Sequence, residues 1–272
     1  MDPRIETSLV QALKTLDFRD LLERAAPAMG LPGPRPRMEV AREIAAVIAR
    51  DRGRGRELAR RLGEEEREDA RLLAAAAFAA FAVNGSGRAE ALADLQELAG
   101  DTHGAVRAGV IDAVRMMLVA DLTGTLVDLR AWMDGFLQAH VVLEALTDRQ
   151  ILATIPRVEP IRELLDTAFE LCDGAPRSAD RWQGVRTLRQ GMPAQITAFV
   201  SRFSELYDWV LAHMTAQRPE TREVMEQTIQ ALGRASFRKA DVDVLRDALA
   251  KSAKAPRDPS RIVHGTRKRS KR

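Results

Sequence analysis

Residues 72–83 read LLAAAAFAAFAV and contain no polar side chain. A helix that is apolar all round must be covered on every side, since no face of it suits water. Alanine has the highest helix propensity, and its small side chain lets neighbouring helices approach closely. This stretch therefore predicts a buried helix that is surrounded by other helices.

The composition of the whole chain also favours helices. The 272 residues are 46% apolar but only 4% aromatic, so the interior must be built from Ala, Leu, Val, Ile and Met. Sheets favour β-branched and aromatic residues, and no segment alternates apolar and polar residues over a useful length. Most of the 42 basic residues are arginines, a bias that we attribute to genome composition rather than to function. The fold class is predicted to be all-α.

Apolar residues at helical spacing predict several further helices, and turn-forming residues separate them. One helix is expected over residues 4–28 and another over residues 38–50, with a Pro- and Gly-rich break between them at residues 30–37. Residues 50–71 are dense in charge, with opposite charges four apart, which is typical of a solvent-exposed helix. Asn84–Gly87 predicts a turn.

From residue 92 onward a helix–turn–helix pattern recurs. The first unit spans residues 94–118 and the second residues 126–152, and their breaks at Asp101 and Asp134 are 33 residues apart. Two looser units follow. Repeats of this length are typical of helical solenoids. We therefore expect an α-solenoid of stacked antiparallel helix pairs, HEAT-like or armadillo-like, that forms a single domain over residues 1–250.

Residues 92–118 resemble the HEAT-repeat consensus, in which an Asp closes the first helix of a pair and a Val-Arg pair opens the second. The residues that carry the resemblance are Leu95, Leu98, Asp101, Val106 and Arg107. The second unit keeps the Asp but has His140 where Arg107 would fall. The resemblance implies a curved stack with a concave surface, and a structural Arg107 that contacts acids in the turn between helices.

The three tryptophans suggest a more specific resemblance. Each has an acid within two residues in the sequence: Trp132 with Asp134, Trp182 with Asp180, and Trp209 with Asp208. The alkylpurine DNA glycosylases, a branch of the HEAT-like proteins, use concave-face tryptophans and an Asp on a damaged, positively charged nucleotide. The chain is similar to that family in length, helical repeats and basic character. Aromatic faces attract a cationic base, and a carboxylate stabilises the developing sugar cation.

The chain also departs from the glycosylase pattern. That family places its catalytic Asp one helical turn after a Trp, whereas these positions here hold Phe136, Arg186 and His213. No catalytic residue can therefore be carried over, and whether the chain is an enzyme stays open. The alternative is that the tryptophans pack in the core and the acids form turns.

Two basic features predict contact with nucleic acid. Arg186 and Arg189 lie three residues apart and share a helix face, which is either a phosphate-contacting stripe or an ordinary solvated edge. Residues 251–272 hold nine Lys or Arg and one Asp, a net charge of +8, so the whole-chain charge of +3 leaves −5 for the other 250 residues. We expect this segment to be disordered and to bind polyanions, or else to act as a solubilising terminus. Its densest cations are Arg267, Lys268, Arg269, Lys271 and Arg272.

Other chemistry finds little support in the sequence. There is no Gly-rich phosphate loop, no Gly-x-Ser-x-Gly elbow and no regular metal-ligand spacing among the four histidines, so we expect no cofactor and no metal. The one cysteine, Cys172, is expected to be a buried structural thiol. No apolar run approaches the ~20 residues that span a bilayer, and no signal peptide is recognisable. We expect a cytoplasmic protein that does not contact membranes.

Three hypotheses for the function follow. The first is a non-enzymatic HEAT-like scaffold that contacts nucleic acid through a basic concave face and the basic C-terminal segment. The second is a DNA glycosylase for alkylated bases, which requires a Trp and an Asp exposed together in a positive groove. The third is a protein–protein adaptor with no role in nucleic-acid binding.

Overall fold

The structure is a computed structural model that describes residues 1–252, except for residues 34, 86, 217 and 236. Every regular element in this part of the chain is a helix, which confirms the all-α prediction. The α-helices are α1 (Pro3–Thr15), α2 (Arg19–Ala28), α3 (Met38–Ile48), α4 (Arg54–Glu64), α5 (Glu68–Val83), α6 (Arg88–Ala99), α7 (Gly104–Ala120), α8 (Leu122–Leu129), α9 (Phe136–Leu146), α10 (Arg149–Thr154), α11 (Glu159–Gly174), α12 (Gln183–Arg202), α13 (Leu206–His213), α14 (Pro219–Arg234) and α15 (Lys239–Lys251). Two 3₁₀ helices are η1 (Arg130–Asp134) and η2 (Arg177–Arg181).

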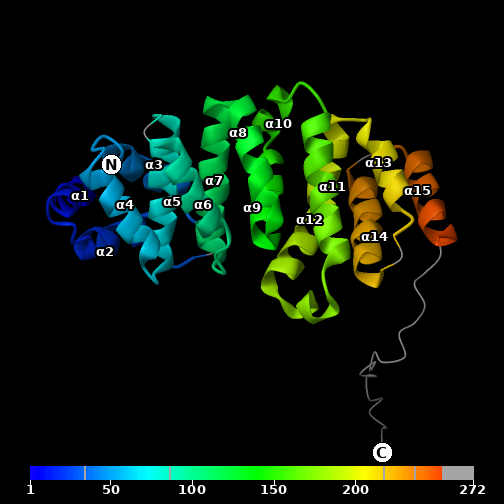
Figure 1. Cartoon of the computed structure of the whole chain (residues 1–272), viewed down its shortest axis with the longest axis horizontal. Coiled ribbons are helices and arrows are strands. Elements are labelled where there is room, and N and C mark those ends of the chain that lie inside the picture. The colour runs from blue at the N-terminus through cyan, green and yellow to red at the C-terminus, as the bar shows by residue number, and fades with distance from the viewer. Residues whose placement is uncertain (34, 86, 217, 236, 253–272) are drawn as a thin grey trace, which may run out of the picture.

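The helices follow one another in chain order along the long axis of an elongated molecule (Figure 1). Helices α5, α7, α9, α12 and α14 form a row in which each helix packs against the next. Helix α6 packs against both α5 and α7, and α11 packs against both α9 and α12. One cluster of buried apolar side chains extends from Ile5 in α1 to Leu249 in α15. Each helix pair therefore shares its core with the pairs on either side of it.

Helix α5 contains the alanine-rich stretch and is enclosed on all sides. Residues 72–82 are all buried, and helices α2, α3, α4, α6 and α7 pack around them. The approach of α7 is especially close: a Cβ added at Gly109 would lie 3.2 Å from the Cγ atom of Leu72. The prediction of a buried helix surrounded by helices is thus confirmed.

Two predicted helices are each divided in the structure. The helix expected over residues 4–28 breaks at Leu16, whose φ of 60° is left-handed, and the Asp17 side chain then accepts the N–H of Arg19 at the start of α2. The helix expected to run on to Ile151 ends at Leu146, because Asp148 caps a new helix, α10, through the N–H groups of its first turn. Neither break contains Gly or Pro, so the sequence gave no strong warning of it.

Arginine side chains bind carbonyl groups at the ends of many helices. The last four carbonyls of a helix have no partner within the helix, and a guanidinium carries five N–H donors that can reach them. The pairs of this kind are Arg54 with Lys14, Arg107 with Asp101, Arg115 with Glu144, Arg189 with Cys172, Arg202 with Ile155 and Arg222 with Leu249. The arginine content of the helical part therefore has a structural use.

The turn between α6 and α7 has the most enclosed of these arrangements. The carboxylate of Asp101 pairs with Arg71 at 2.5 Å, and both side chains are largely buried. Burial opposes the charge on Asp101, but hydrogen bonds from His103 and the charge of Arg71 lower the pKa of this carboxyl group. Arg107, which the HEAT resemblance assigned to acids in this turn, donates instead to the Asp101 backbone carbonyl at 2.7 Å.

Replacing Arg71 tests the importance of this enclosed pair. Arg71→Met should lower the free energy of unfolding by about 3–5 kcal/mol, because it leaves the Asp101 carboxylate buried without its cation. Arg24→Met removes an exposed ion pair to Asp20 and should leave the free energy of unfolding nearly unchanged. Urea unfolding of both variants measures the difference, and equal losses would contradict the assignment.

Candidate functional site

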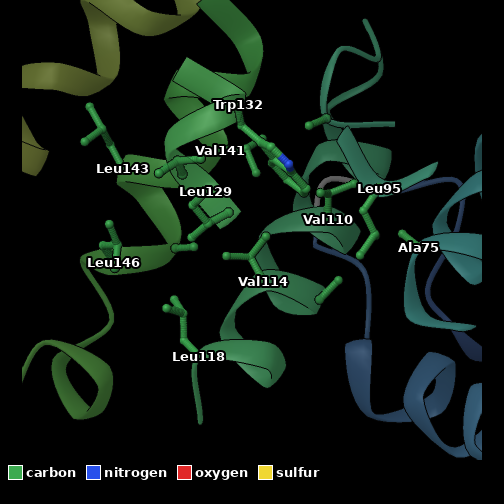
Figure 2. Close-up of a cluster of buried hydrophobic side chains, with 14 of the residues drawn as sticks. Ala75, Leu95, Val110, Val114, Leu118, Leu129, Trp132, Val141, Leu143 and Leu146 are labelled. Atoms are coloured by element: carbon green, nitrogen blue, oxygen red, sulfur yellow. The ribbon is translucent and has the colours of Figure 1, made fainter. Parts of the chain in front are cut away.

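Two of the three tryptophans lie in the core. Trp132 is 2% exposed and packs with Leu129 and Val141 between helices (Figure 2). Trp209 is 6% exposed, stacks on the ring of His213 and donates its Nε1–H to Asp166 at 2.6 Å. The prediction that these two rings line a groove is therefore wrong, because both are covered by neighbouring helices.

The acids predicted to accompany the tryptophans are placed differently from expectation. Asp134 and Asp208 are both exposed, at the end of η1 and in the first turn of α13. The carboxylate that contacts Trp209 is Asp166 of α11, 43 positions earlier in the chain. No local sequence signal pointed to Asp166, since only the packing of α13 near α11 brings it there.

The third tryptophan, Trp182, lies at the solvent-exposed start of α12. Its side chain is 56% exposed, and its carbonyl accepts the N–H of Arg186, one helical turn later. Arg186 and Arg189 line a hollow of about 250 Å³ between η2, α12 and α14. The structure thus brings three predicted residues, Trp182, Arg186 and Arg189, to one end of α12.

This hollow, which we call the α12–α14 hollow, is not a basic stripe. Arg189 is largely buried and donates to Asp180 and to the Cys172 carbonyl, both at 2.9 Å. Two further acids, Glu220 and Glu223, line the same hollow. Its charges are therefore mixed. The other predicted nucleic-acid contacts, Arg267, Lys268, Arg269, Lys271 and Arg272, lie outside the described residues.

A buried polar cluster joins α9 to α12. The amide of Gln195 is fully buried, donates to Glu144 at 3.1 Å and lies 3.3 Å from the His140 Nδ1 atom. A Cβ at Gly191 would lie 2.7 Å from the same nitrogen, so the two helices meet closely here. Burial lowers the pKa of His140, against the opposing charge of Glu144 and with the help of Arg107.

An open groove lies beside this cluster, where α7 passes α3, α5 and α10. We call it the α7 groove; its volume is about 530 Å³. Its apolar wall is formed by Val83, Met116, Val119, Ala120 and Ile151, and its polar rim by Arg42, Asp112, Arg115, Asp148 and Gln150. Val119 is 76% exposed, the highest value among the large apolar side chains of the described chain. Sequence reasoning missed this groove because four separate helices contribute to it.

The cations around the α7 groove are already bound within the protein. Arg42 forms two hydrogen bonds to the Asp112 carboxylate, each 2.8 Å long. Arg115 donates to the carbonyls of Glu144 and Ala145 at the end of α9. A surface that binds phosphates needs cations free to replace counterions. This surface instead combines an exposed apolar centre with paired charges at its edge.

Other kinds of site find no support in the described residues. Cys172 is buried, and burial raises the pKa of its thiol to about 12, as suits a structural cysteine. Within residues 1–252, no group of three His, Cys, Asp or Glu side chains could hold a metal ion. In the same part of the chain, no helix combines the length and apolar character needed to cross a membrane.

Comparison with known proteins adds no assignment. A search against protein-family models found no match to the chain. A search of curated proteins found no relative either. The geometry of the α7 groove, the α12–α14 hollow and the buried cluster is therefore what bears on function.

The buried cluster predicts a dependence of stability on pH. The pKa of His140 is lowered in the folded chain, so between that value and its ordinary 6.5 the unfolded chain binds more protons. The free energy of unfolding should therefore fall as the pH drops from about 7.5 to about 5, the range around the ordinary pKa of histidine. His140→Gln should reduce this slope in urea unfolding across the pH series. A variant with the slope of the parent protein would show that His140 does not contribute.

Proposed function

We propose that the chain is a non-catalytic α-solenoid scaffold of HEAT-like helix pairs that binds a protein partner in the α7 groove. The order of the helices along the long axis, with each row helix packed against the next, supports the solenoid (Figure 1). A single helix pair cannot bury its apolar faces alone, but a stack of pairs can, and such stacks present extended binding surfaces. The step from stack to scaffold is an analogy of fold, so the groove must carry the functional argument.

The observation that carries the proposal is the apolar centre of the α7 groove. Val119 and Val83 both expose large parts of their side chains to solvent, and Met116 lies between the charged rim residues and the core. Exposed apolar side chains that gather in a rimmed groove are typical of interaction sites. Protein interfaces have this same division into an apolar centre and a polar edge.

A role in nucleic-acid binding is the second candidate, and it rests on the C-terminal segment. Five of the last six residues are Lys or Arg, enough to bind a polyanion in a salt-dependent way. The helical part offers less, because its well-placed arginines are bound to carbonyls and carboxylates. The glycosylase alternative is the least supported, since Trp132 and Trp209 are buried and the charges beside Trp182 are mixed.

Site-specific photo-crosslinking tests the proposal. A benzophenone amino acid replaces Gln150, an exposed rim residue, in the full chain within the cells that make it. Illumination should give a covalent protein adduct that nucleases do not alter. Val119→Asp should abolish this adduct, because it places a charge at the apolar centre of the interface.

Val244→Asp provides the matched control for this experiment. Val244 lies on α15 and is 50% exposed, so its substitution changes charge equally but lies away from the α7 groove. The adduct should persist in this variant. No adduct at all, or an adduct that survives Val119→Asp, would contradict the proposed interface.

A further inference from the structure

The α12–α14 hollow contains opposite charges that do not satisfy each other. Arg186 projects from α12 and Glu223 from α14, and both line the hollow. Neither side chain forms an ion pair with any other residue in the described part of the chain; Glu223 accepts one hydrogen bond, from Gln227 at 3.2 Å. A free cation and a free carboxylate thus share one concave space without contact.

The rest of the hollow is held firmly in place. Arg189 and Asp180 form a 2.9 Å ion pair on the α12 side, and Arg189 is further fixed by the carbonyl of Cys172. Val224, which is buried, supplies an apolar patch beside Glu223. The groups left to bind a ligand are therefore the guanidinium of Arg186, the carboxylate of Glu223 and the amide of Gln190, which is exposed.

The size and charges together define a ligand class. A space of about 250 Å³ corresponds to roughly eight water molecules at ~30 Å³ each, and so to a ligand of roughly eight to ten non-hydrogen atoms. A guanidinium binds a carboxylate through two parallel hydrogen bonds, and a carboxylate binds an ammonium group. We propose that the α12–α14 hollow binds a small zwitterion of the amino-acid class, with its carboxylate on Arg186 and its ammonium group on Glu223.

This ligand site is independent of the proposed partner interface. The α12–α14 hollow and the α7 groove have no lining residue in common. A ligand could therefore bind here whether or not a protein binds in the groove. The two proposals succeed or fail in separate experiments.

Thermal unfolding of the full chain with a panel of small compounds tests the site. The panel contains α- and ω-amino acids of up to roughly ten non-hydrogen atoms, with matched compounds that carry only the carboxylate or only the amine. At least one amino acid should raise the Tm by roughly 5 °C at a hundredfold excess over its Kd, because only the native chain binds it. The matched single-charge compounds should raise the Tm far less.

Substitutions in the hollow complete the test. Arg186→Gln and Glu223→Gln should each weaken binding at least tenfold, measured by calorimetry with the amino acid that gives the largest shift. Both side chains are exposed, so the variants should fold as the parent does. Arg162→Gln and Glu170→Gln, which change exposed residues of α11, are the matched controls and should bind normally.

Three results would overturn the proposal. These are a panel in which no amino acid shifts the Tm, equal shifts from the single-charge compounds, and unchanged affinity in Arg186→Gln and Glu223→Gln. Trp182 gives a second readout, since it lies one helical turn from Arg186 and is exposed. Its fluorescence should change on binding in the parent protein, and that change should be absent in Trp182→Phe.

Discussion

The close packing of helices around α5 is the constraint on which the rest of the structure depends. Alanine side chains allow five helices to enclose α5, and Gly109 lets α7 approach it almost backbone to side chain. Because α3 and α7 both lie against α5, Arg42 of the one reaches Asp112 of the other, 70 positions along the chain. That ion pair forms part of the rim of the α7 groove. The groove is thus a consequence of how α5 is buried.

Arginine does much of the remaining work, and this decides the electrostatic character of the surface. Carbonyls at helix ends need donors, and a long stack of short helices has many such ends. Arg107, Arg115 and Arg189 all serve them from the central helices. Cations used in this way do not attract phosphate. A chain with a formal charge of +3 and many arginines therefore has a helical part whose charges are largely matched within it.

Patterns local in sequence predicted the fold better than the sites. The apolar run at residues 72–83 and the Gly- and Pro-containing breaks gave correct helices, because helix burial and termination depend on nearby residues. The break at Leu16 was missed since a left-handed leucine has no compositional signal. Sequence proximity of Trp and Asp misled, because burial of Trp209 against Asp166 depends on helices distant in the chain. The acids facing Arg186 could not be foreseen for the same reason.

The central claim is that the helical part binds protein, so any affinity for nucleic acid resides in the C-terminal cations. The most direct measurement is fluorescence anisotropy of duplex DNA across a salt series. It compares the full chain with a variant in which Arg267, Lys268, Arg269, Lys271 and Arg272 are glutamine. The account predicts that the variant does not bind, while any binding by the full chain weakens with salt at a logarithmic slope no steeper than about −4.5 for five phosphate contacts. A variant that kept the affinity and salt dependence of the full chain would contradict the account, since the helical part would then carry a phosphate-binding surface.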